Sequence, residues 1–480
     1  MSTSQAPAAR RGLALGLIAA AQFMVIMDTS IIGVALPRIQ TDLGFTAESL
    51  SWVFNAYVVA FGGLLLFGGR LADLFGARRV FTAGWATLLA GSVAAGVATS
   101  PSVEIAARAV QGAGAALIAP SALTLLMMLF GSSPKELTKA LAVYGAAAPA
   151  GGTAGVFLGG VITEYLAWPW VFYINVPIAA VVLVATPRLL PAGGGRTGSL
   201  DAIGSIAVTA GLAAAVYGIV RAPEAGWDAG STWAILASSA VLLGGFLVLQ
   251  ARRRDPLMRL SIFASPNLAA ANLAQVFLGA AWIPMWFFLN LYLQQVLGYD
   301  AFPAGAALLP MTGLIMVGMI VVAPRAMGRF GAKPMIVTGL SVLAIAMGWL
   351  SFVRPDGSFW IDVLPASLVA AFGMSLAFIP SLGTAISAAP PQDGGLASGI
   401  VNVSYQIGSA LGLATVTAVA SAHGAGVTTS VSELTDGFSA AFVGAAVIAA
   451  AGAVVAAAAL RPNHPETPGR VAADRDLLEV

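Results

Sequence analysis

The 480-residue chain has no cysteine and only two histidines, His423 and His464. Disulfides, thiolate metal sites and cysteine nucleophiles are therefore excluded, and the two histidines offer little to a metal ion. Charge is also scarce, since 9% of the residues are Asp, Glu, Lys or Arg, against about 25% in soluble domains. We expect no metal, no cofactor and no nucleic-acid partner, because the positive charges are spread over many short segments.

Motifs of nucleotide-dependent and hydrolytic enzymes are missing as well. The sequence contains no G-x-x-x-x-G-K-[ST] phosphate loop, no G-x-S-x-G and no H-E-x-x-H. The G-x-G of "GAGAAL" lies inside an apolar helix rather than after a strand, which argues against dinucleotide binding. ATP is therefore not the expected energy source, and catalysis is not the expected activity.

Apolar residues are abundant instead, at 58% of the chain. Apolar segments of about 18 residues or more recur from end to end, and each can cross a hydrocarbon core of about 30 Å as a helix. The sequence therefore predicts an all-α membrane protein with about fourteen spans. Their predicted ranges are 13–36, 50–69, 79–98, 102–128, 140–163, 168–187, 203–221, 232–250, 268–293, 304–323, 334–352, 362–386, 398–420 and 438–460.

The positive charges orient these spans, because Lys and Arg collect on the cytoplasmic side of a membrane. With a cytoplasmic N-terminus, the outer segments hold only Arg38, Arg221 and Arg354 of the 23 Lys and Arg residues. An even number of spans, cytoplasmic termini and a plasma (cell inner) membrane location follow. A cleaved signal at Arg10 and Arg11 is the disfavoured alternative, because the apolar run is too long and contains a carboxylate.

An internal repeat predicts two related halves. "GRLADLFGARR" around Gly76 has a degenerate copy, "PRAMGRFGAKP", around Gly331, and Gly155 and Gly412 lie in glycine-rich helices at a similar offset. The predicted organisation is a cytoplasmic N-terminus (1–12), an N-terminal six-helix bundle (13–190), a cytoplasmic linker (191–202), two inserted helices (203–250), a C-terminal six-helix bundle (251–460) and a cytoplasmic tail (461–480).

Two charges lie well away from the ends of predicted spans: Asp28, in "MDTSIIGVALPRI", and Arg108, in "RAVQGAGAA". Counting residues puts Asp28 about 12 Å and Arg108 about 9 Å below the outer ends of their helices. A charge within a bilayer costs about 2.5 to 3.5 kcal/mol on insertion scales and needs a partner or water. We expect Asp28 to face a central cavity with Arg108 as its nearest cation. Snorkelling of Arg108 to the headgroups is the alternative.

The segment 69–79, "GRLADLFGARR", predicts a tight cytoplasmic connection. Gly69 begins the motif, Gly76 permits a turn, and Arg78 and Arg79 hold the connection inside. Asp73 is a candidate gate residue, since it could accept hydrogen bonds from the free amides that begin a facing helix at Gly394 and Gly395. A role in topology alone is the alternative.

A glycine face predicts close helix packing in the fifth span. Gly151, Gly155 and Gly159 recur at steps of four, and Gly160 lies beside them. Packing alone is one interpretation, and sealing of the cavity against the other half is the second. Candidate cavity-lining residues elsewhere are Gln111, Trp286, Tyr292, Asn402 and Gln406, and for the aromatic ones packing or an interfacial position is the alternative.

Together these stretches resemble the motifs of the 14-helix drug:proton antiporters of the major facilitator superfamily. "WPWVFYINVPI" (168–178) and "GLASGIVNVSYQIGSALG" (395–412) add to the resemblance, which spans nearly the whole chain. One departure is "GVFLGG", where Val156 replaces the proline of the antiporter motif. The resemblance implies a two-lobed fold, coupling of proton and substrate through Asp28 and Arg108, and a gate at Asp73.

The sequence thus predicts a proton-coupled transporter that exports small, largely apolar or amphipathic compounds by alternating access. Its expected partners are a small-molecule substrate, protons and the lipid bilayer, and a monomer is expected. A proton-linked uptake carrier or facilitator of the same fold is the alternative, which Val156 keeps open. A membrane-embedded enzyme or a sensor is disfavoured, because no convergent catalytic groups and no output domain are visible.

Overall fold

The computed structural model describes residues 8–131, 133–192, 201–253, 256–389, 394–425 and 430–461. Within these ranges the chain is almost entirely helical. The first part comprises α1 (Ala8–Leu43), α2 (Ala47–Leu50), α3 (Trp52–Phe75), α4 (Ala77–Gly96), α5 (Pro101–Phe130), α6 (Pro134–Tyr165), α7 (Trp170–Tyr173), α8 (Asn175–Leu189), α9 (Ala202–Ala225) and α10 (Gly230–Arg252).

The second part begins with the single turn η1 (Leu260–Ala264) and contains four one-turn π segments. Its elements are α11 (Pro266–Leu291), η2 (Tyr292–Val296), α12 (Ala301–Ala307), α13 (Leu309–Val317), η3 (Gly318–Val322), α14 (Ala323–Phe330), α15 (Ala332–Leu350), η4 (Phe359–Val363), α16 (Leu364–Ser387), α17 (Gly394–Ala420), η6 (Ser421–Ala425) and α18 (Val431–Ala459). We call α1–α8 the N-terminal half, α11–α18 the C-terminal half, and α9 with α10 the inserted pair.

Thirteen helical segments of the described chain are long and apolar enough to cross a membrane. A further helix, α4, has 20 residues and packs among them. Each of the fourteen ranges predicted from the sequence falls on a helix. The predicted linker and tail lie mostly outside the described residues.

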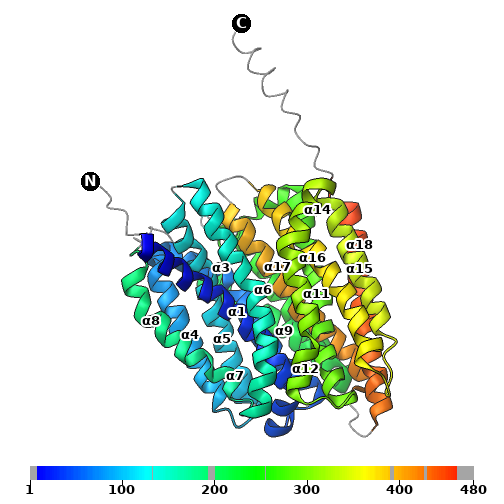
Figure 1. Cartoon of the computed structure of the whole chain (residues 1–480). Helices are drawn as coiled ribbons and strands as arrows, with labels where there is room; N and C mark the ends of the chain where they lie inside the picture. Colours follow the sequence, from blue (N-terminus) through cyan, green and yellow to red (C-terminus); the bar gives the residue numbers. More distant parts are fainter. Residues whose placement is uncertain are drawn as a thin grey trace, which may run out of the picture.

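The two halves stand side by side, with the N-terminal half on the left of Figure 1 and the C-terminal half on the right. Within the halves, α3 packs on α5, α4 on α5, α11 on α17 and α15 on α16. The inserted helix α9 contacts both α3 and α17, so it lies at the seam between the halves.

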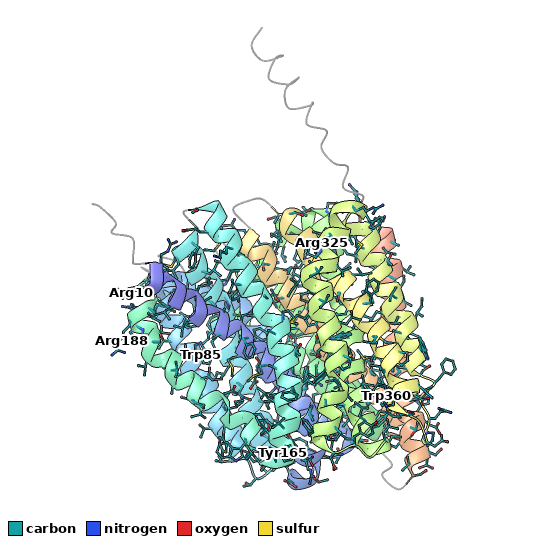
Figure 2. All side chains as sticks on the ribbon, viewed as in Figure 1. Arg10, Trp85, Tyr165, Arg188, Arg325 and Trp360 are labelled. Carbon is teal, nitrogen blue, oxygen red and sulfur yellow. The ribbon has the colours of Figure 1, made fainter. Side chains whose placement is uncertain are left out.

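Two ends of the bundle can be distinguished. We call the end that carries Ala8 and Arg461 the terminal end, and the opposite end, with the turns after α1, α4 and α6, the distal end. Figure 2 shows Arg10, Arg188 and Arg325 at the terminal end and Tyr165 at the distal end. Arg10 donates to the backbone oxygen of Arg188 and so ties the start of α1 to the end of α8.

Helix α1 is longer than the sequence predicts, and it is tilted. It has 36 residues and ends at Leu43 rather than near residue 36. At 1.5 Å per residue it is about 54 Å long, and Figure 1 shows it crossing its half diagonally. Residue counting from a predicted helix end therefore misjudges the depth of Asp28.

The repeated glycines Gly76 and Gly331 join consecutive helices in the same way. Gly76 lies between α3 and α4 with φ of 91°, and Gly331 lies between α14 and α15 with φ of 81°. These are left-handed backbone conformations that glycine adopts without a side-chain clash. The expected connection at 69–79 is thus a single residue, since Gly69 to Phe75 continue α3.

Candidate functional site

Asp28 of α1 and Arg108 of α5 form a buried ion pair. Arg108 Nη1 donates to Asp28 Oδ2 at 2.8 Å, and the two side chains are 0% and 1% exposed. The structure therefore brings the two intramembrane charges together, and Arg108 does not snorkel to the headgroups. Asp28 does not face an open cavity in this conformation, because polar side chains of the N-terminal half surround its carboxylate.

Those side chains come from α4, α5 and α8. Gln111 Nε2 donates to Asp28 Oδ1 at 3.2 Å, and Asn175 Nδ2 donates to the same oxygen at 2.8 Å. Both amides also contact Ser92 Oγ, at 2.8 Å and 3.1 Å. We call Asp28, Ser92, Arg108, Gln111 and Asn175 the Asp28 cluster. All five residues are buried.

The guanidinium of Arg108 is held from several sides. Its Nε donates to the backbone oxygen of Val53 at 2.9 Å, and its Nη1 also donates to Gln111 Oε1 at 2.8 Å. The guanidinium carbon lies 4.6 Å from the ring centre of Tyr57 and 5.9 Å from that of Phe172. These contacts satisfy Nε and Nη1 and orient a charge that an apolar environment would otherwise reject.

Glycines let the surrounding helices approach closely enough for these bonds. A Cβ on Gly91 of α4 would lie 2.8 Å from the backbone nitrogen of Gln111, and a Cβ on Gly112 of α5 would collide with the backbone of Tyr57. Small residues at such crossings bring helix backbones together in membranes. The positions of Arg108 and Gln111 are therefore fixed by backbone contacts as well as by polar bonds.

The arrangement permits a charge-coupled proton exchange. Asp28 accepts hydrogen bonds from three side chains as a carboxylate, and protonation of Asp28 would remove the counter-ion of Arg108. Breaking one partner of a buried ion pair is costly because the other charge stays uncompensated. Protonation at Asp28 can therefore be linked energetically to a rearrangement of the helices that carry the cluster.

The glycine face of α6 packs on α1. A Cβ on Gly155 would lie 2.8 Å from the oxygen of Met27, and one on Gly159 would lie 2.6 Å from that of Ile31, while Gly151 faces the backbone of Phe23. Three of the four predicted packing glycines thus contact a helix of their own half, not the C-terminal half. Gly160 alone of the four faces the other half, at Ala301 and Phe302.

We expect Gly155→Ala to weaken both stability and transport. Its methyl group would overlap the backbone beside Asp28, and overpacking of this kind costs about 1 to 3 kcal/mol. Thermal unfolding followed by tryptophan fluorescence measures the loss. Gly152→Ala is the matched control, since its nearest neighbours would lie 3.8 Å away. Equal unfolding temperatures for the two variants would contradict the close contact.

The residues of the predicted gating loop lie at the terminal end. Arg78 Nη1 donates to the backbone oxygens of Pro187 and Leu190, at 3.4 Å and 3.3 Å, and so binds the end of α8. Asp73 and Arg79 are exposed, and Gly69 packs near Pro120. The surroundings of Gly394 and Gly395 lie outside the described part of the structure, so the gate role of Asp73 stays a prediction.

The candidate cavity residues are dispersed. Gln111 belongs to the Asp28 cluster, Trp286 lies against Gly33 of α1, and Gln406 of α17 lies against Gly62 of α3. Asn402 is exposed and bonds its own helix at Ser398. Tyr292 is buried and donates to the backbone oxygen of Arg354 at 2.7 Å, so it anchors a distal loop.

Three functional candidates were missed by the sequence prediction: Ser92, Glu104 and Asn175. Asn175 is an amide inside an apolar run, and Glu104 is a carboxylate one helical turn before Arg108, so both carried a detectable signal. Ser92 carried none, because serine is common in membrane helices and hydrogen-bonds its own backbone. Its role depends on the three-dimensional meeting of α4 with α5 and α8.

Comparison with known proteins places this fold. The family model described as Major Facilitator Superfamily matches residues 18–413. The chain belongs to the major facilitator superfamily. It is 41% identical to the cephamycin export protein CmcT of Amycolatopsis lactamdurans, over 92% of this chain and 91% of that one. It is 37% identical to the puromycin resistance protein pur8 of Streptomyces alboniger, over 86% and 83% of the two chains.

A third relative of this superfamily member is the tetracenomycin C resistance and export protein of Streptomyces glaucescens, with 31% identity over 83% of this chain and 73% of that one. Among solved structures, one from work on proton dependent oligopeptide transporters superposes with a TM-score of 0.64 and 18% identity, over 93% of this chain and 98% of that one. That likeness concerns the fold alone. Membership of a transporter superfamily indicates a multi-pass membrane transporter rather than an enzyme.

Proposed function

We propose that this protein exports antibiotics or related small secondary metabolites across the cell membrane in exchange for protons. The observation that carries the proposal is the buried Asp28–Arg108 pair, with 2.8 Å between Oδ2 and Nη1, because a protonatable group held inside a bilayer indicates a proton pathway. The names of the relatives support export as the direction, since they include a cephamycin exporter and a tetracenomycin C exporter.

The distal end is the outer face in this proposal. Of the described Lys and Arg residues outside the Asp28 cluster, only Arg38, Arg221 and Arg354 lie toward the distal end, and the remainder gather at the terminal end. This asymmetry favours cytoplasmic termini. The transporter would then work as a monomer in the plasma membrane, with the two halves moving against each other.

Contacts between the halves at the distal end support an outward gate that is closed in this conformation. Gln294 Nε2 donates to the oxygen of Val34 at 3.1 Å, and Gln295 Nε2 donates to Gln40 Oε1 at 3.0 Å. The amide of Ala301 donates to Glu164 Oε2 at 3.1 Å. Proton entry from outside would require these bonds to open.

In the proposed cycle, Asp28 takes up a proton when the distal end opens and releases it to the cytoplasm when substrate binds from that side. One proton moving inward supplies about 2.3 kcal/mol per 100 mV of membrane potential, and about 1.36 kcal/mol per pH unit. These amounts suffice to drive export against a moderate gradient. The ion pair links the two events, because Arg108 gains or loses its counter-ion at each step.

Everted membrane vesicles with an imposed internal acidity test the direction of exchange. We expect a cephamycin or puromycin, added outside such vesicles, to release internal protons, which a fluorescent pH dye records. Vesicles without the protein give the baseline. An uptake carrier would instead move substrate and proton in the same direction, so proton entry with the substrate would contradict export.

A cross-link tests alternating access at the distal end. The chain has no cysteine, so Gln40→Cys with Gln295→Cys introduces the only two thiols. We expect a short bis-methanethiosulfonate cross-linker, which forms a disulfide with each thiol, to hold the distal gate closed and stop transport. A reductant that cleaves these disulfides should restore it. Each single variant treated with the same reagent is the control. Undiminished transport by the cross-linked protein would rule out opening at this contact.

A further inference from the structure

Glu104 is a buried carboxylate without a bonding partner. It lies in the first turn of α5, four residues before Arg108. Its side chain is 0% exposed, and within the described part of the chain neither carboxylate oxygen has a hydrogen-bond partner. Arg108 Nη2 is equally buried and equally without a partner there. The donor Arg108 Nη2 and the two carboxylate oxygens of Glu104 thus lie on neighbouring turns of one helix, and none of them is paired.

A purely structural role does not account for Glu104. The carboxylate does not cap α5, since the cap residue Ser100 contacts Ser102 Oγ at 3.2 Å and no first-turn amide donates to Glu104. A Glu four residues before an Arg is the favourable order for a helical ion pair. That pair is absent, because Arg108 directs Nη1 and Nε to Asp28, Gln111 and the backbone of Val53.

The geometry fits a neutral Glu104 beside an ionised Asp28. A buried carboxylate ion without hydrogen bonds or counter-ion would cost several kcal/mol, and the neutral acid avoids most of that cost. The charged groups that act on Glu104 are Arg108 of α5 and Asp28 of α1. Tyr57 of α3 lies against Arg108, and α4 brings no charged residue between Val80 and Gly96. The charges of Arg108 and Asp28 then cancel. With Glu104 neutral, the three buried side chains together carry no net charge.

Resting on the proposed function, we propose that Glu104 is the proton-loading site of this transporter. Glu104 takes a proton from the distal side and passes it to Asp28, while Arg108 exchanges Asp28 for Glu104 as its counter-ion. The O–H bond breaks at Glu104 and forms at Asp28, and the guanidinium keeps its charge throughout. The sum of the charges is unchanged, so no uncompensated ion arises in the interior.

The position of Glu104 suits this order of transfer. It lies three residues after α5 begins at Pro101, about 5 Å along the axis from the distal end of the helix. Arg108 follows about 6 Å deeper. A proton that enters from the distal face therefore meets Glu104 before it meets the ion pair.

Infrared spectroscopy of the purified full-length protein in lipid tests the charge state without any substrate. A protonated carboxyl group shows a C=O stretch that an ionised one lacks, and an unbonded C=O absorbs at the high-frequency end of that range. We expect this band in the wild-type protein and its loss in Glu104→Gln. Glu136→Gln is the matched control, since Glu136 is exposed and binds Arg11. Absence of a Glu104 band in the wild-type protein would overturn the inference.

The exchange itself is tested by Asp28→Asn, in which Glu104 is untouched. With Asp28 neutral, Arg108 should take Glu104 as its counter-ion. The high-frequency band should then disappear, while the total carboxylate signal stays the same because Glu104 gains the charge that Asp28 loses. A band that persists unchanged in Asp28→Asn would overturn the exchange. This measurement does not depend on whether Glu104→Gln folds.

Transport separates this inference from the function on which it rests. In everted vesicles, Glu104→Gln should slow puromycin-driven proton release by about 5- to 150-fold, the usual range for coupled sites, and Glu104→Asp should restore part of the rate. Wild-type rate and pH profile in Glu104→Gln would overturn the role of Glu104 and leave the export proposal intact. If the wild-type protein fails to export, the proposed function is wrong, but the infrared band still reports whether Glu104 is protonated.

Discussion

Asp28→Asn is expected to reduce proton-coupled efflux by about 100-fold, a loss within the usual range for coupled sites. The amide cannot take up or release a proton, so the step that links proton movement to the tilt of the halves is absent. An amide oxygen in the place of Oδ2 can still accept from Arg108 Nη1, and Glu104 lies one turn before Arg108 as a replacement counter-ion. The variant should therefore insert and fold.

Drug-dependent proton release in everted vesicles measures this effect, and counterflow of labelled substrate shows whether binding survives. Asp436→Asn is the matched control, because Asp436 is exposed on α18 and far in sequence from the cluster. We expect that control to transport at the wild-type rate. Full coupling in Asp28→Asn would remove Asp28 from the mechanism.

Arg108→Ala is expected to have the largest effect on stability. It leaves the carboxylate of Asp28 buried at 1% exposure with its cation gone, and removal of one partner from a buried pair costs about 3 to 5 kcal/mol. It also leaves the oxygens of Val53 and Gln111 without their donor. Transport should be lost together with stability.

The unfolding temperature can be followed by intrinsic fluorescence, since the chain has ten tryptophans. Arg108→Lys is the informative companion: it restores the charge but cannot reproduce the separate bonds of Nε and Nη1. We expect its unfolding temperature to lie between those of Arg108→Ala and the wild-type protein. A value for Arg108→Ala equal to that of the wild-type protein would show that the pair contributes nothing to folding.

The helices were predictable because their physical cause is local. About 18 apolar residues cross a bilayer as a helix whatever their partners are, and the Lys and Arg distribution fixes their alternation. Helix ends were less predictable. The end of α1 at Leu43 was missed because Pro37 and Arg38 marked an apparent boundary, although Pro37 lies inside the helix.

The site was predictable only in part. Asp28 and Arg108 stood out because charges within spans are expensive, and that same cost brings them together. Gln111 was predicted as a cavity residue, and Asn175 carried a detectable signal. Their contacts with Ser92 could not be predicted, since these contacts join α4, α5 and α8, which no sequence period relates. The glycines of α6 were recognised as a packing face, but their neighbour is α1 because the long tilted helix crosses α6, a geometry absent from the sequence pattern.

That crossing has a mechanical consequence. Gly151, Gly155 and Gly159 rest on the main chain of α1 over the segment that ends three residues after Asp28. Because the two backbones are in direct contact, no flexible side chain between them can adjust if one helix slides along the other. Helices α1 and α6 should therefore move as one rigid body. A displacement of α6 then moves the acidic group of Asp28 by a similar amount.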